Sequence, residues 1–379
     1  MAKAQKQEFR FEASTLLPST AASDDVYRLQ ALLAKYGFLS NYTPGVYDQR
    51  TQDAVSQFQS FYRIYPEDDG VADAATISLL SQIRCGVPDV PAPEETTAQP
   101  LAPFVTVGAK WTNSALTYRF LNSSPDLPEQ RQREIIRQAF QRWQNVSGLT
   151  FSELAQGNAN LMIGFYAGSH GDGSSFDDQG GPDGNTLAHG FFPPPRGGQW
   201  AGALHFDEFE QWKDQPGGAG IRLYNVALHE IGHCLGLAHS QDNSAIMYAY
   251  YAENRNDLQP DDIAGIQSLY GAPAAAPTSL SPGDKVSGHL ARTGAEASYQ
   301  VTVQDKMLVK LSGPSDQDFD VYVRFGQPVD RARQRYDEVS WGVTSEELVT
   351  IPNPQAGTYY ILVYSHRGAG SYTLETRVT

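Results

Sequence analysis

The chain has 379 residues, 40% of them apolar, two cysteines and a formal net charge of −15. This length exceeds one ordinary core and predicts two or three domains, and the negative charge argues against nucleic acid as a partner because phosphates would be repelled. Two cysteines do not make a disulfide framework, and no apolar run is long enough to span a bilayer.

Residues 1–23 are an N-terminal extension in which Glu8, Arg10 and Glu12 stand where a signal peptide needs an unbroken apolar stretch. We therefore expect either that export does not follow the usual route or that a signal has been removed. Residues 24–89 have apolar side chains at helical spacing and predict three helices, the first capped by Asp24 or Asp25. Prolines and small polar residues mark 90–103 as an exposed linker.

Residues 104–272 predict one α/β domain, with strands at 116–121 and 160–167 and helices at 128–146, 223–237 and 260–271. The Gly- and Asp-rich stretch 168–190 is longer than a loop that merely connects two elements, so we expect a ligand to order it. A second linker, 273–279, precedes alternating apolar and polar residues that predict an all-β domain over 280–379.

The stretch "HEIGHCLGLAHS", residues 229–240, carries most of the functional information. His229 and His233 are four residues apart and share one face of a helix, and a turn at Gly236 can return His239 as a third ligand. Three histidines and a water describe a catalytic zinc site with an open position. Glu230 is then the expected general base, which takes a proton from the zinc-bound water.

A bare His-Glu-x-x-His also occurs by chance on surface helices, and the glycine and third histidine make chance a poor explanation here. The "AIMY" stretch at 245–248 follows the third histidine. A methionine in a tight turn at this position forms the hydrophobic floor of the site in the metzincins, so we assign Met247 to that floor rather than to general core. Cys234, one residue past His233, is expected to be core.

These motifs resemble the proenzyme form of a matrix metalloproteinase, or matrixin, over residues 24–271. "IRCGVPD", residues 83–89, matches the cysteine-switch motif of the family, except that Ile83 stands where the family usually has proline. The helices before it resemble the family's peptidoglycan-binding-like prodomain. The resemblance implies a mixed twisted sheet with three helices, and a latent enzyme in which Cys85 occupies the open zinc position while Arg84 and Asp89 pair and hold the loop.

The resemblance also implies a second, structural zinc. Its ligands fall at His170, Asp172, His189 and His205, three nitrogens and one oxygen that suit closed tetrahedral zinc. Carboxylates beyond them suit calcium, which prefers oxygen ligands, and we expect Asp177, Asp207 and Glu210 to bind it. A solvated acidic loop remains the alternative for the neighbouring Asp178 and Asp183, because this loop is about four residues longer than the usual family loop.

A metzincin cleft binds an extended peptide, with the main specificity pocket beside the zinc. Its wall is expected at 248–262, whose three tyrosines and lack of an inward-facing charge predict preference for a medium or large apolar residue after the cleaved bond. Residues 280–379 resemble a bacterial pre-peptidase C-terminal domain, which implies a jelly-roll-like sandwich and a bacterial source. The expected protein is a secreted monomer with zinc and calcium, protein substrates and an activating protease.

The alternative to a protease is a protein that binds cell wall or matrix and uses its metal sites only for stability. An intact Glu230 argues against it, because a purely structural site has no use for a base. A metalloenzyme acting on small molecules is a third class, which Met247 and Cys85 in their motifs disfavour.

Overall fold

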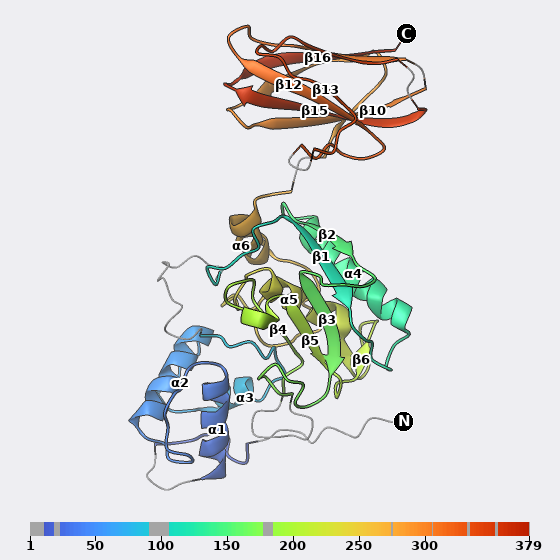
Figure 1. Ribbon diagram of the computed structural model, residues 1–379. Helices are drawn as coiled ribbons and strands as arrows, with labels where there is room; N and C mark the ends of the chain where they lie inside the picture. Colours follow the sequence, from blue (N-terminus) through green and yellow to red (C-terminus); the bar gives the residue numbers. More distant parts are fainter. Residues whose placement is uncertain are drawn as a thin grey trace. The chain divides into compact units, whose positions relative to one another are not determined.

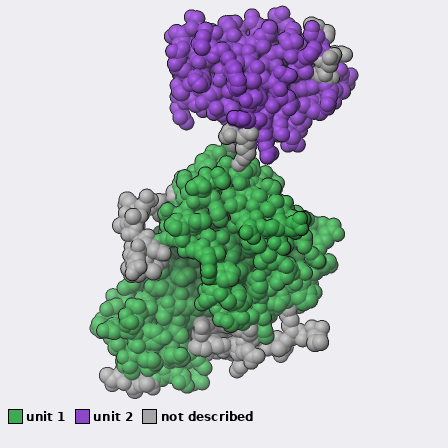
Figure 2. All heavy atoms as spheres, viewed as in Figure 1, with its two compact units in different colours: residues 1–273 green, residues 274–379 purple. Residues whose placement is uncertain are grey.

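The computed structural model describes residues 11–18, 23–90, 106–176, 185–273, 276–304, 306–331, 334–352 and 355–378. The chain divides into two compact units, residues 1–273 and residues 274–379 (Figure 2). Within the described residues, no helix is both long and apolar enough to cross a membrane.

The first unit begins with three helices, α1 (Asp24–Lys35), α2 (Gln49–Tyr62) and α3 (Ala74–Leu80) (Figure 1). Ser23, not an aspartate, caps α1, because its Oγ accepts a hydrogen bond from the Val26 N–H at 3.2 Å. Asp25 lies inside the first turn and instead accepts from the Glu12 and Ala13 N–H groups. The apolar faces of the helices meet in one core, whose buried members include Leu29, Leu33, Val55, Phe58 and Ile77.

The rest of the first unit is built on a five-stranded sheet (Figure 1). Its strands are β1 (Ala115–Phe120), β2 (Thr150–Glu153), β3 (Leu161–Tyr166), β4 (Ala188–Gly190) and β5 (Ala203–Asp207), in the order β2-β1-β3-β5-β4. All neighbours are parallel except β4, which runs antiparallel to β5 at the edge. The mixed sheet agrees with the expected α/β class.

Helices α4 (Glu129–Gln144), α5 (Leu223–Cys234) and α6 (Pro260–Tyr270) complete this region, together with the short strands β6 (Trp212–Lys213) and β7 (Ile221–Arg222). Nearly every residue of α5 is buried, including the polar side chains of Asn225, His229, Glu230 and His233. The Trp143 indole of α4 donates a hydrogen bond to the Leu228 carbonyl of α5 at 2.9 Å. This packing holds α5 as a rigid support for side chains at its ends.

The second unit is β-rich and consists of two sheets, in the orders β13-β12-β15-β10-β8 and β14-β11-β16-β9. The strands are β8 (Thr278–Leu280), β9 (Lys285–Leu290), β10 (Glu296–Val303), β11 (Met307–Ser312), β12 (Asp318–Phe325), β13 (Glu338–Ser340), β14 (Glu347–Ile351), β15 (Gly357–Arg367) and β16 (Gly370–Val378). Side chains from both sheets share one apolar cluster. The predicted β-rich class is confirmed, and the jelly-roll connectivity stays a prediction.

Candidate metal centres

The histidines of "HEIGHCLGLAHS" converge at the end of α5. His229 and His233 lie one turn apart on the helix, and their Nε2 atoms are 3.1 Å apart. The chain then turns at Gly236, where φ is +105° and a Cβ would lie 2.3 Å from the Ala109 carbonyl oxygen. Only glycine tolerates both conditions. The turn brings the Nε2 of His239 to 3.1 Å from that of His233.

A hydrogen bond to the opposite ring nitrogen orients each of these imidazoles. The Nδ1 of His229 lies 2.6 Å from the Ile246 carbonyl oxygen, and the Nδ1 of His233 lies 2.7 Å from that of Leu237. Carbonyls only accept, so each Nδ1 carries the proton and each Nε2 presents a lone pair to the centre. Burial lowers the pKa of all three histidines, which keeps them neutral, as metal ligands must be.

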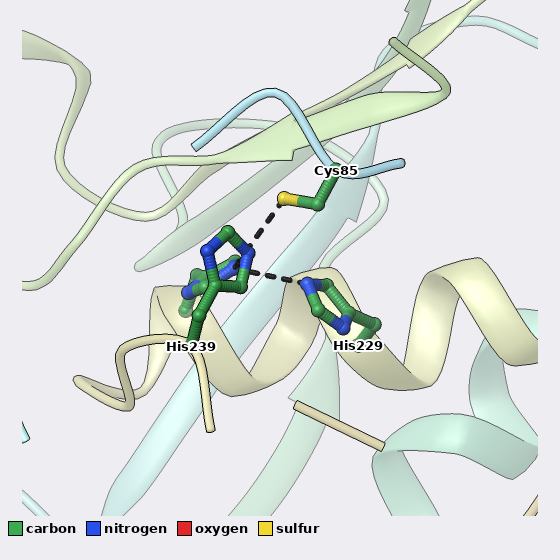
Figure 3. Close-up of side chains that lie close together, drawn as sticks. Cys85, His229 and His239 are labelled. Carbon is green, nitrogen blue, oxygen red and sulfur yellow. Dashed lines mark hydrogen bonds between the residues drawn. The ribbon is translucent and has the colours of Figure 1, made fainter. Parts of the chain in front are cut away.

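Cys85 completes this group from the loop after α3. Its Sγ lies 3.4 Å from the Nε2 of His233, and the four ligand atoms all lie within 4.8 Å of one another (Figure 3). Tetrahedral zinc, with bonds of about 2.0–2.1 Å to nitrogen and about 2.3 Å to sulfur, places its ligand atoms about 3.3–3.6 Å apart. The four residues therefore fit a zinc ion by donor type and spacing.

The segment around Cys85, residues 83–89, is here called the switch segment. Its first part, residues 83–86, lies between two parts of the α/β region, and the chain bends at Gly86 and Val87. On one side it pairs in parallel with 185–188, through the Arg84 N–H to Asn185 and the Gly86 N–H to Ala188. On the other side the Cys85 N–H donates to the Ala249 carbonyl at 3.0 Å. The segment therefore satisfies its backbone polar groups on both edges, as a strand inside a sheet does.

Arg84 and Asp89 form a bidentate ion pair at the base of the switch segment, with distances of 2.7 and 2.9 Å. Both are buried, and the guanidinium lies 3.5 Å from the centre of the Tyr36 ring and 4.9 Å from that of Tyr250. Asp89 Oδ1 also lies 2.6 Å from the Nδ1 of His239. Burial opposes ionisation of Asp89, but Arg84 and His239 outweigh it and lower the pKa of Asp89 to about 2.

The link between Asp89 and His239 was not anticipated from the motifs. It makes a switch-segment carboxylate the partner that orients the third histidine, in the way that carboxylates commonly orient metal-bound imidazoles. We call the Arg84–Asp89–His239 arrangement the clamp.

Glu230 lies on α5 beside the three histidines and is completely buried. No hydrogen bond of ordinary geometry reaches its carboxylate oxygens, although the Cys85 thiol and the Gly190 backbone lie near enough to favour its charged form. Burial raises the pKa of Glu230 to about 8. A buried, unpaired carboxylate is costly for stability, so its presence at this position points to a chemical role.

The second predicted ligand set also comes together. Asp172 Oδ2 lies 2.7 Å from His170 Nε2, 2.8 Å from His189 Nε2 and 2.7 Å from His205 Nδ1. The three ring nitrogens are 3.2–3.4 Å apart. His189 and His205 face each other across the β4–β5 pair, which explains why residues distant in sequence meet. His205 uses Nδ1 where the others use Nε2, a detail that sequence spacing does not reveal. The donor set fits zinc.

Three parts of the chain match models of known protein families. Residues 110–271 match the Matrixin family model. The chain therefore carries a matrixin domain. Residues 22–80 match a putative peptidoglycan binding domain, and residues 295–365 match the bacterial pre-peptidase C-terminal domain.

Similar proteins include horse interstitial collagenase, 41% identical over 260 residues that make up 67% of this chain and 51% of that protein. Mouse stromelysin-1 is 40% identical over 230 residues, which is 60% of this chain and 44% of stromelysin-1. Human matrix metalloproteinase-16 is 36% identical over 282 residues, 70% of this chain and 45% of that protein. The chain thus spans about half the length of the curated relatives it matches.

The predicted floor residue of the matrixin domain, Met247, lies directly beneath α5. A Cβ at Gly232 would lie 2.3 Å from the Met247 sulfur, so the helix and the methionine are in close contact. The turn that carries Met247 is held by Asp262 of α6, whose carboxylate accepts from the Ile246 and Met247 N–H groups at 2.9 and 3.0 Å. Sequence reasoning missed Asp262, although its place in the first turn of α6 offered a signal.

The predicted calcium ligands do not form a recognisable site in the described residues. Asp177 lies outside the described part of the chain, as do Asp178 and Asp183. Asp207 ends β5 and is fully buried, and Glu210 follows in the next turn, where its N–H donates to the Asp207 carbonyl at 3.3 Å. The calcium assignment stays a prediction. Cys234 is buried and forms no disulfide, as expected for core.

Proposed function

We propose that the protein is a latent zinc endopeptidase that hydrolyses peptide bonds in protein substrates and is kept inactive by its own switch segment. The observation that carries the proposal is the meeting of Cys85 Sγ with the Nε2 atoms of His229, His233 and His239, all within 4.8 Å. The fourth ligand comes from a segment outside the matrixin domain, so its release leaves three histidines and an open position, which is the ligand arrangement of a catalytic zinc.

Zinc, when bound by the three histidines, supplies a Lewis acid that polarises a peptide carbonyl and makes a water molecule more acidic. Glu230 serves as the general base. Release of the switch segment exposes this carboxyl to water, which removes part of the burial that raises its pKa, and the carboxylate then accepts a proton from the attacking water and returns it to the leaving amine. The Nδ1 hydrogen bonds of His229 and His233 to backbone carbonyls hold the ligand geometry while this happens.

Latency follows from the position of the switch segment. Cys85 fills the place that water needs, and the paired backbone of 83–86 fills the place of an extended substrate. Cleavage by an activating protease within 90–103 would separate the prodomain from the matrixin domain and release the thiol. Most of that linker lies outside the described residues.

We assign the remaining predicted features to support of this activity. His170, Asp172, His189 and His205 hold a structural zinc that fixes residues 170–176 against the β4–β5 edge of the sheet. Asp207, Glu210 and Asp177 bind calcium beyond it. The protein acts outside the cell as a monomer.

The test is cleavage of a quenched fluorogenic peptide by full-length protein, before and after limited proteolysis. We expect activity only after proteolysis in the unaltered protein, activity without proteolysis in Cys85→Ala, and none in Glu230→Gln. Cys234→Ala is the matched control, since it removes the other buried thiol and should leave latency intact. If neither the zinc-loaded, proteolysed protein nor Cys85→Ala cleaves the peptide, the protein is not an endopeptidase.

A further inference from the structure

The switch segment is not the only part of the prodomain that contacts the matrixin domain. Lys35, the last residue of α1, donates from its Nζ to the Thr186 Oγ1 at 2.8 Å. The carbonyl of Ser81, directly after α3, accepts from the Asn185 Nδ2 at 2.8 Å. Both contacts lie outside the zinc site. They place the ends of two prodomain helices against 185–188, the segment that also pairs with the switch segment.

Two residues of the matrixin domain belong to the apolar core of the prodomain. Ala249 and Tyr250 are members of that cluster and are only 2% and 1% exposed. The Tyr62 ring of α2 lies 5.2 Å from that of Tyr250 and 5.6 Å from that of Tyr248. Separation of the two domains would therefore expose apolar surface on both, which is the situation in a stable protein–protein interface.

These contacts do not need an intact linker. The prodomain residues that make them, from Lys35 to Asp89, precede the linker 90–103, and their partners, from Asn185 to Tyr251, follow it. A cut in the linker therefore removes the tether but none of the contacts. It changes the concentration of the prodomain at its site, and the intrinsic affinity of the two surfaces stays the same.

The size of this change depends on dilution. A short flexible tether holds a bound module at an effective concentration in the millimolar range. After the cut, the protein's own concentration takes its place, so the tendency to stay closed falls about a thousandfold at about 1 µM and about a millionfold at about 1 nM. Interfaces with a buried apolar centre and hydrogen bonds along their edges have dissociation constants from micromolar to picomolar.

We propose that the excised prodomain stays on the matrixin domain as a separate, non-covalent inhibitor, and that dilution or destruction of the prodomain completes activation. The partner of the surface formed by 185–188 and 249–251 is thus a cleaved fragment of this same chain, and Lys35 is a recognition residue outside the zinc site. The inhibitory consequence rests on the proposed endopeptidase activity, but the association can be measured without it. The cut in 90–103 permits release of Cys85, and dissociation of the prodomain achieves it.

The test uses full-length, zinc-loaded protein with a recognition sequence for a site-specific protease inserted in the linker 90–103, so that one cut leaves the prodomain whole. Gel filtration at about 10 µM should show the two fragments migrating together, and the Cys85 thiol should stay unreactive toward a maleimide. On dilution to about 10 nM, cleavage of a fluorogenic peptide per mole of protein should rise at least tenfold as the prodomain dissociates.

The two readouts separate this inference from the proposed function. Fragments that migrate apart at about 10 µM, with cleavage per mole that does not change on dilution, overturn the inference and leave the proposed function intact. Fragments that migrate together, with no cleavage at any dilution and none by Cys85→Ala, support the association and overturn the proposed function. Separated fragments without cleavage overturn both.

Lys35→Met tests the docking surface without altering the zinc ligands or the clamp. It removes the hydrogen bond to Thr186, so the protein concentration that gives half-maximal cleavage per mole should rise about tenfold, the effect of one hydrogen bond to a charged group. Arg50→Met is the matched control, because the Arg50 Nη1 donates at 2.6 Å to the Asn41 carbonyl within the prodomain itself. An equal shift in both variants, or no shift in Lys35→Met, would contradict the role of Lys35.

Discussion

Replacement of Asp89 by asparagine should release the latency of the uncut protein. The change preserves shape but removes the charge that pairs with Arg84, whose side chain is only 1% exposed. Breaking a buried ion pair by removing one partner costs about 3–5 kcal/mol, because the other charge stays buried and uncompensated. When the switch segment leaves the zinc site, which we call the open state, Arg84 reaches water and this cost is avoided. The variant should therefore favour the open state.

The lower figure, about 3 kcal/mol, corresponds to a factor of about 150 in the ratio of open to closed protein. We expect basal cleavage of a fluorogenic peptide by uncut Asp89→Asn to rise by about that factor above the unaltered protein. The Cys85 thiol should become reactive toward a maleimide to the same extent. Zinc content is measured in parallel, since Asp89 also orients His239.

Glu134→Gln is the matched control. It breaks the Arg131–Glu134 pair, whose side chains are 35% and 40% exposed, and exposed pairs contribute less than about 1 kcal/mol. Latency should not change in this variant. If zinc-loaded Asp89→Asn is as silent and as unreactive toward maleimide as the unaltered protein, the clamp does not hold the switch segment closed.

Three further predictions concern other parts of the chain. Gly86→Ala places a Cβ 2.6 Å from Thr186 Cγ2, so it should raise basal activity of the uncut protein, and Thr186→Ser, which lacks that methyl group, should restore latency in the double variant. His205→Ala should lose one equivalent of zinc by metal analysis and lower the melting temperature, whereas unchanged zinc content would exclude His205 as a ligand. Burial raises the pKa of Asp320 from 3.8 to about 6, so the folded second unit binds more protons than the unfolded chain between these values. The free energy of unfolding of that unit should therefore fall by on the order of 2 kcal/mol as pH rises from about 4 to 6, and Asp320→Asn should remove the dependence in denaturant titrations.

The metal ligands were predictable from sequence because their spacing reflects local geometry. His229 and His233 share a helix face by periodicity alone, and Gly236 provides the turn that returns His239. The helices and the β-rich C-terminal region were predictable for the same reason, since apolar periodicity is a local property. The resemblance to a known family then supplied the ligands that no local pattern connects.

The contacts that were not predictable join segments far apart in the chain. Asp89 and His239 are 150 residues apart, and their hydrogen bond depends on how the switch segment docks. Asn225 reads in sequence as one polar residue on an apolar helix, and its hydrogen bonds to 252–255 exist only once that loop folds beneath it. The inward position of Arg255 likewise depends on two carbonyls of the same loop, which is why the sequence pattern suggested a pocket without charge.

A small cavity beside His229 and Glu230 lies between α5 and the segment 248–252, and these two walls differ in what supports them. Ala249 and Tyr250 belong to the same apolar cluster as the prodomain helices, and the Tyr62 ring of α2 lies 5.2 Å from that of Tyr250. Removal of the prodomain exposes this wall, and re-exposing one large apolar side chain costs about 1.5–3 kcal/mol. That wall therefore has reason to rearrange on activation. The opposite wall is α5, held by Trp143 and Met247 inside the core of the matrixin domain. The α5 wall should thus keep its shape on activation better than the wall formed by the tyrosines of 248–251.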